Sequence, residues 1–206
     1  MKVLLIALGF LTMSAAAQGQ STLPERLKAV QGDPVVLKAA LDAGRRTTFF
    51  CANCHGEEGI SKAPEVPNLA GQNPAYLLEQ IRKFSVGERK DQFMQGLIKV
   101  LNDDERVQVA LFYASLPVAP TRADPALAAH GKVLFDKLCL RCHGERAHGA
   151  ELYPRIASQN VVYLQASIRR YRDRTGVRNN QLMSIATGGL KDDEIVAIAS
   201  YLSQLP

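Results

Sequence analysis

The sequence predicts an all-α protein made of two similar domains in tandem. The second half of the chain repeats the residue pattern of the first half at an offset of 87–89 residues. In each half, apolar residues recur at the three- and four-residue spacing of helices that bury one face. No segment alternates apolar and polar residues as a half-buried strand does. Because a period of this length indicates a duplicated domain rather than a solenoid repeat, we expect domains at residues 41–117 and 126–206.

The N-terminus has the composition of an export signal. A lysine at position 2 precedes an apolar run at residues 3–13, and three alanines at 15–17 form a small-residue cleavage site. The run is shorter than the roughly 20 residues that span a bilayer. We expect residues 1–17 to be removed, with the mature chain beginning near Gln18 in the periplasm; an uncleaved membrane anchor is the alternative.

Residues 18–40 form an extension that precedes the repeat and has no counterpart in the second copy. The pattern assigns it no function. It carries enough apolar side chains to pack on the first domain: Leu27, Val30, Val35, Val36, Leu37 and Ala40.

Helix ends are recognisable within each copy. Asn73 precedes a proline, which combines a favoured N-cap with a favoured first helical residue. Three acidic residues follow Asn102, and again Lys191, and they suit the positive end of a helix dipole. Proline-rich residues between the copies predict a linker at 118–125. We expect helices over residues 74–86 and 161–172, and closing helices that begin after Asn102 and near Lys191.

Each copy contains one Cys-x-x-Cys-His motif, and the two motifs use every cysteine of the chain. This motif is the attachment signature of c-type haem. The two thiols add across the two vinyl groups of the haem, and the adjacent histidine reaches the iron. The chain is therefore expected to hold two covalently attached haem c groups, through Cys51, Cys54 and His55 in the first copy and Cys139, Cys142 and His143 in the second.

Other uses of paired cysteines account for the pattern less well. A four-cysteine zinc site usually separates its pairs by about 12–20 residues, whereas Cys54 and Cys139 lie 85 positions apart. A thioredoxin-like pair belongs in a βαβ context, but the flanking residues have a helical pattern. Disulfides are compatible with export, yet they give no reason for the two histidines.

The second axial ligand of each iron is predicted to be a methionine. Only Met94 and Met183 remain after the signal is removed, and they stand at equivalent positions, 39 and 40 residues after the motif histidines. The rival ligands His130 and His148 have no partners in the first copy and are expected to be exposed. Histidine and methionine together fill the coordination sphere and raise the reduction potential relative to two histidines. These properties indicate an electron carrier, not an enzyme, with no small-molecule substrate.

Charge restricts the partners. Residues 18–120 hold 12 Lys and Arg against 12 Asp and Glu, and residues 121–206 hold 12 against 8. The haem propionates would bring the protein closer to neutrality, so nucleic-acid binding is not supported. Five arginines of the second copy suggest a basic face that docks on an acidic redox partner, with binding that weakens as salt rises: Arg169, Arg170, Arg172, Arg174 and Arg178.

Each half resembles a small class I cytochrome c, and the tandem over residues 41–206 is similar to the cytochrome c4 family. The resemblance rests on the two haem motifs, the two methionines, and the matching segments Pro-Asn-Leu-Ala-Gly-Gln-Asn at 67–73 and Pro-Arg-Ile-Ala-Ser-Gln-Asn at 154–160. Serine replaces glycine in the second segment. The resemblance implies that the Pro67 and Pro154 carbonyls accept a hydrogen bond from the histidine ligands and raise their basicity.

The same resemblance implies a periplasmic carrier between a quinol-oxidising complex and a terminal oxidase, soluble or peripherally associated with the membrane. Arg89 and Arg178, each five residues before a methionine, are candidates to pair with haem propionates. Two alternatives stay open. One is a dihaem subunit of a periplasmic dehydrogenase, such as flavocytochrome c sulfide dehydrogenase. The other is a dihaem peroxidase, although peroxidases need an open or displaceable ligand and are usually longer.

Overall fold

The computed structural model describes residues 21–120 and 124–206. These residues form eleven α-helices, and their only β-structure is an isolated bridge between Ala150 and Tyr153. The predicted all-α fold is therefore confirmed. None of the described helices is long and apolar enough to cross a bilayer. The predicted export signal at 1–17 and part of the predicted linker, residues 121–123, lie outside the described residues.

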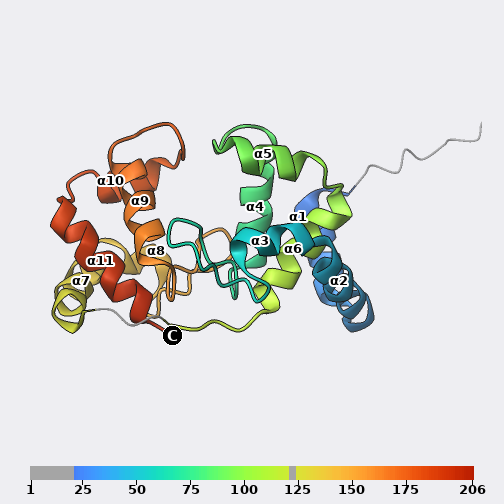
Figure 1. Cartoon of the computed structure of the whole chain (residues 1–206), viewed down its shortest axis with the longest axis horizontal. Helices are drawn as coiled ribbons and strands as arrows, with labels where there is room; N and C mark the ends of the chain where they lie inside the picture. The colour runs from blue at the N-terminus through green and yellow to red at the C-terminus, as the bar shows by residue number, and fades with distance from the viewer. Residues whose placement is uncertain (1–20, 121–123) are drawn as a thin grey trace, which may run out of the picture.

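The helices form two groups that occupy opposite ends of the molecule (Figure 1). Helices α2 to α6 of the first half correspond in order to α7 to α11 of the second half. The first group consists of α1 (Leu23–Gly32), α2 (Pro34–Thr47), α3 (Phe49–His55), α4 (Pro74–Ser85), α5 (Gln92–Lys99) and α6 (Asp103–Ser115). The second consists of α7 (Pro125–Leu138), α8 (Leu140–His143), α9 (Val161–Arg172), α10 (Gln181–Thr187) and α11 (Asp192–Gln204).

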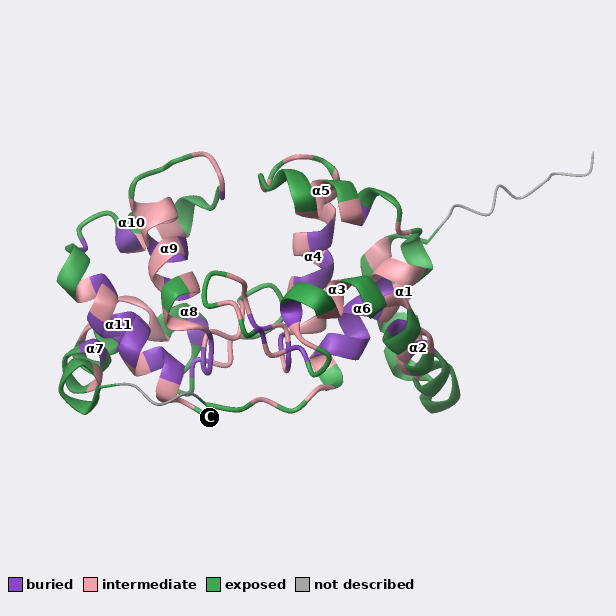
Figure 2. Cartoon of the chain, viewed as in Figure 1, coloured by how far each residue is buried: buried purple, intermediate pink, exposed green. Residues whose placement is uncertain are grey.

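Each group has its own hydrophobic core, visible as buried segments on the inner helix faces (Figure 2). In both cores the helix before the Cys-x-x-Cys-His motif crosses the last helix of its half, α2 against α6 and α7 against α11. A glycine lies at each crossing. A Cβ on Gly44 would come within 2.4 Å of the Gln108 carbonyl oxygen, and one on Gly131 within 2.0 Å of the Ala197 carbonyl oxygen. The absence of a side chain therefore allows these helices to approach closely.

The N-terminal extension packs on the first half, as its apolar residues predict. Leu27 and Ala40 are buried in the first core, and Val30 and Leu37 are partly buried against it. Two valines of the predicted set, Val35 and Val36, instead face solvent. Helix α2 runs across residue 40 without a break, so the extension and the first domain share one continuous helix.

The closing helices begin where the acidic residues predict. Asn102 is the N-cap of α6, where its side chain accepts a hydrogen bond from the Glu105 N–H and the Glu105 carboxylate accepts one from the Asn102 N–H. Lys191 is the N-cap of α11, and the Glu194 carboxylate accepts from its N–H. A lysine side chain can only donate, so this helix start has half of the reciprocal arrangement.

The two halves meet through the loops that follow the haem motifs, residues 56–73 and 144–160, which lie together at the centre of the molecule (Figure 1). Asn73 and Asn160 are the N-caps of α4 and α9, as predicted for Asn73. Their side chains, however, make no capping hydrogen bond, and the Nδ2 of each donates to backbone carbonyls of the opposite half.

Candidate haem-binding sites

Each Cys-x-x-Cys-His motif occupies the end of a short helix. His55 is the last residue of α3 and His143 is the last residue of α8. The glycines that follow, Gly56 and Gly144, have φ angles of 80° and 76°. Glycine adopts this backbone conformation without steric cost, so the chain can turn sharply after each histidine. None of the four cysteines forms a disulfide, so both sulfurs of each motif are available for haem attachment.

Both motif histidines are oriented by a backbone carbonyl. His55 Nδ1 lies 2.9 Å from the Pro67 carbonyl oxygen, and His143 Nδ1 lies 3.0 Å from that of Pro154. Because a carbonyl oxygen can only accept, Nδ1 carries the proton and the Nε2 lone pair is available to a metal. Burial lowers the pKa of both imidazoles, which favours the neutral, metal-binding form.

The two methionines lie in the first turns of equivalent short helices, α5 and α10. The N-cap Asp91 accepts a hydrogen bond of 3.0 Å from the Met94 N–H, and the N-cap Asn180 accepts one of 3.0 Å from the Met183 N–H. Both methionines line the same cavity as the motif histidines. The structure therefore brings the cysteines, histidine and methionine of each half together, although they are about 40 residues apart in sequence.

A single cavity of about 740 Å³ runs through both sites. The four cysteines, two histidines and two methionines all line it. Its wall is mainly apolar, but two buried polar atoms in it, Tyr113 Oη and Arg155 Nε, have no hydrogen-bond partner among the described residues. Apolar walls with a few unpaired polar groups suit a large planar ring that carries carboxylates. The thiol pairs, the neutral imidazoles and these donors all fit a covalently attached haem in each half.

The arginines that were candidates for propionate binding lie in the cavity wall at the junction of the halves. Arg178 is buried and donates to Tyr76 Oη of the first half at 2.8 Å and to Tyr163 Oη at 3.1 Å. Arg89 of the first half also donates to Tyr163 Oη, at 3.1 Å. Equivalent arginines therefore each reach the equivalent tyrosine of the opposite half.

These tyrosines were not among the predicted site residues. The signal was present, because Tyr76-Leu77 and Tyr163-Leu164 match in the repeat, but the sequence alone does not show that both hydroxyls accept from Arg178. Burial alone would raise the pKa of Tyr163, yet the guanidinium groups of Arg178 and Arg89 outweigh it and lower that pKa to about 7. Burial raises the pKa of Tyr76. The junction is therefore a buried polar cluster rather than an apolar contact.

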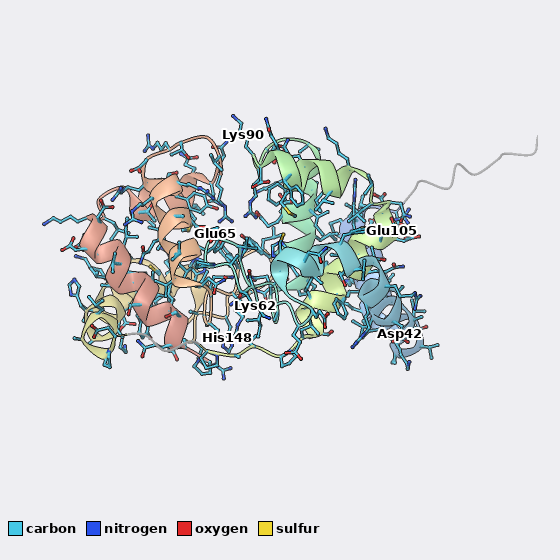
Figure 3. The ribbon with its side chains drawn as sticks, viewed as in Figure 1. Asp42, Lys62, Glu65, Lys90, Glu105 and His148 are labelled. Carbon is cyan, nitrogen blue, oxygen red and sulfur yellow. The ribbon has the colours of Figure 1, made fainter. Side chains whose placement is uncertain are left out.

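The two remaining histidines take no part in the cavity. His130 is exposed, and His148 Nε2 donates to the Pro206 carbonyl at 2.8 Å near the C-terminus (Figure 3). Neither lines the cavity.

The prediction that five arginines of the second copy form a basic docking face is wrong, because not all five positive charges are available to a partner. Arg178 is buried, and Arg169 and Arg172 form ion pairs with Asp192 at 3.0 Å. Arg172 also pairs with Asp173 at 2.7 Å. The carboxylates that neutralise these arginines come from the end of α9 and the start of α11, which only the folded chain brings together.

Comparisons with known proteins agree with this geometry. The family model described as Cytochrome c matches residues 128–206. Cytochrome c4 of Pseudomonas aeruginosa is 31% identical over 79% of this chain and 87% of its own length. The reduced recombinant cytochrome c4 from Pseudomonas stutzeri has a similar structure, with a TM-score of 0.75 and 30% identity over 80% of this chain and 98% of that one. A thiosulfate dehydrogenase electron acceptor of Thiomonas intermedia is 32% identical over 76% of this chain and 78% of its length.

Proposed function

The chain belongs to the cytochrome c4 family of dihaem electron carriers, and on that premise we propose that it carries electrons in the periplasm from a quinol-oxidising complex to a terminal oxidase. Its cofactors are two covalently bound haem c groups, and it is an electron carrier rather than an enzyme. An exported mature chain that begins near residue 18 is part of the proposal, since c-type haem is attached outside the cytoplasm in bacteria.

The proposed ligand sets are repeated between the halves. In the first half Cys51 and Cys54 would form the thioether bonds, and His55 and Met94 would bind the iron. In the second half Cys139 and Cys142 hold the haem. His143 and Met183 would bind its iron. Each of these residues lines the cavity that joins the two halves, which supports this assignment.

The haem iron, when bound, supplies a reversible one-electron couple. The Pro67 and Pro154 carbonyls would hold each imidazole in the Nδ1-protonated form and increase its basicity. Asp91 and Asn180 fix the backbone of each methionine. Mainly apolar walls would surround the haems, and a methionine ligand would raise the potential relative to a second histidine.

The observation that carries the proposal is that each half brings an Nδ1-protonated histidine and a methionine to one cavity. Two filled coordination spheres leave no position for substrate, which suits electron transfer and not peroxidase chemistry. The test is to expose reduced holoprotein to carbon monoxide and to mix it with a purified terminal oxidase. The proposal requires spectra unchanged by carbon monoxide and rapid oxidation by the oxidase. Binding of carbon monoxide by either haem would contradict the closed sites.

A second candidate function is to accept electrons from a thiosulfate dehydrogenase, which is related to the dehydrogenase-subunit alternative. It is favoured by the Thiomonas intermedia relative named as a thiosulfate dehydrogenase electron acceptor. Stopped-flow reduction by a thiosulfate dehydrogenase and by a quinol-oxidising complex, at equal concentrations, separates the two candidates. Faster reduction by the quinol-oxidising complex supports the first candidate, and faster reduction by the dehydrogenase supports the second.

A further inference from the structure

Gln72, in the loop of the first half, bonds to the second half with both ends of its amide group. Its Oε1 accepts from the Arg155 N–H at 2.7 Å, and its Nε2 donates to the Arg155 carbonyl at 2.8 Å. Gln72 is buried. One side chain from the first half therefore satisfies both backbone groups of a single residue of the second half.

The equivalent glutamine makes the reciprocal contact. Gln159 Oε1 accepts from the Asn68 N–H at 2.7 Å, and Gln159 Nε2 donates to the Asn68 carbonyl at 2.9 Å. Both Gln159 and Asn68 are buried. The two halves are thus connected by a pair of matching amide contacts related by the internal repeat.

The asparagine that follows each glutamine bonds the same loop of the opposite half. Asn73 Nδ2 donates to the Tyr153 carbonyl at 2.7 Å, and Asn160 Nδ2 donates to the Val66 carbonyl at 2.7 Å. Asn73 Nδ2 also lies 3.1 Å from the His148 carbonyl oxygen. Both asparagines thus contact the opposite half through their amide nitrogens, and neither makes a side-chain cap on its own helix.

The contacted residues lie on either side of the two prolines whose carbonyls orient the motif histidines. Tyr153 and Arg155 flank Pro154, which accepts from His143. Val66 and Asn68 flank Pro67, which accepts from His55 in the same way. Each proline is therefore held on both sides by side chains of the other half.

We infer that the Gln-Asn pair of each half positions the histidine ligand of the opposite half. Each half therefore influences the haem environment of the other. Gln72 and Asn73 act on His143 through Pro154, and Gln159 and Asn160 act on His55 through Pro67. They are positioning residues, because they contact the supporting loop and not the imidazole. The inference rests on the proposed histidine ligation.

The physical reason is that the proline loops have little regular structure of their own. A hydrogen bond adds only modestly to stability, but a buried backbone group left without a partner costs more than such a bond contributes. Loss of Gln72 would leave both backbone groups of Arg155 unpaired and allow the Pro154 carbonyl to move away from His143. A weaker acceptor at Nδ1–H makes the imidazole less basic, which favours the reduced iron and raises the potential.

The decisive experiment compares Gln72→Leu and Gln159→Leu in the holoprotein, with Gln31→Leu on the exposed surface of α1 as the control. Gln72→Leu is expected to raise the midpoint potential of the second haem and leave the first unchanged, and Gln159→Leu to do the opposite. Met94→Ala and Met183→Ala assign each potential to its haem. A shift at the haem of the mutated half alone, or no shift in either variant, would overturn the inference.

Amide hydrogen exchange gives a readout that does not depend on which residues bind the iron. Gln72→Leu should reduce protection of the Arg155 N–H about tenfold, the equivalent of one lost hydrogen bond, with protection of the Asn68 N–H retained. Faster exchange with unchanged potentials would show that the contact does not position the ligand. If Gln72→Leu fails to fold, Asn73→Ala removes only the bonds on the other side of Pro154, and a smaller shift of the second haem is expected. Binding of carbon monoxide to the unmodified protein would instead contradict the proposed function.

Discussion

Replacing Gly131 by alanine is expected to destabilise the second half, because the new methyl group has no space at the crossing of α7 and α11. Its Cβ would lie 2.0 Å from the Ala197 carbonyl oxygen, 2.5 Å from the Ala197 carbonyl carbon and 2.9 Å from Tyr201 Cβ. Ordinary contacts begin near 3.4 Å. The helices would therefore have to separate by about 1.4 Å, since the nearest atoms belong to the backbone and cannot rotate away.

The expected magnitude follows from two opposing effects. Overpacking a close-packed core costs about 1–3 kcal/mol, and here it disturbs fully buried neighbours such as Phe135 and Ile198. Alanine regains about 0.5–1 kcal/mol through its higher helix propensity. Because the clash is with backbone atoms, we expect a net loss at the upper end, about 2 kcal/mol. That corresponds to a fall in melting temperature of about 10 °C for a domain of this size.

The assay is denaturant or thermal unfolding of the holoprotein, followed by circular dichroism. The matched control is Gly96→Ala, since Gly96 lies inside α5 and its added Cβ would meet no atom within 4 Å. The control should be neutral or slightly stabilising. Gly131→Ala should also change the environment of the second haem, because Ile198 and Leu202 of α11 line its cavity. If Gly131→Ala were as stable as the control, the close crossing of α7 and α11 would be refuted.

Arg155→Gln is expected to lower the potential of the second haem by an amount on the order of tens of mV, because a partly buried positive charge in the cavity wall favours the reduced iron. An unchanged spectroelectrochemical titration would contradict this. Tyr163, with its pKa lowered to about 7 against an ordinary value near 10, should add stability that grows from about pH 7 to pH 10 and is lost as the pH falls through 7. The Tyr163→Phe variant should lack this pH-dependent increase, which is measured by comparing its free energy of unfolding at pH 6 and pH 9 with that of the unmodified protein. An unaltered pH dependence would refute the assignment.

Much of the architecture follows from local sequence patterns. The acidic first turns mark the beginnings of α6 and α11, and the Asn-Pro pair marks the beginning of α4, because caps and dipole interactions involve residues only a few positions apart. The motif histidines and the methionines could be matched between copies because the repeat keeps them at equivalent positions. Their equivalence is visible without knowing how the halves are arranged.

Contacts between the halves could not be predicted in this way. The hydrogen bonds of Arg178, Gln72 and Asn73 depend on how the two loops meet, and nothing in the local sequence specifies that arrangement. The serine that replaces glycine in the second copy is a related case. Ser158 keeps a positive φ of 57°, the conformation of Gly71, and its hydroxyl donates to the Leu205 carbonyl. A serine can occupy this conformation here because a residue distant in sequence supplies its hydrogen-bond acceptor.

We propose that each half would hold one iron through its own histidine and its own methionine. Proton NMR of the reduced holoprotein tests it most directly, because a methyl group bound above a haem resonates far from all ordinary methyl groups. We expect two such methionine signals, one lost in Met94→Ala and the other in Met183→Ala. A spectrum with one signal or none, or a variant that loses neither, would contradict it.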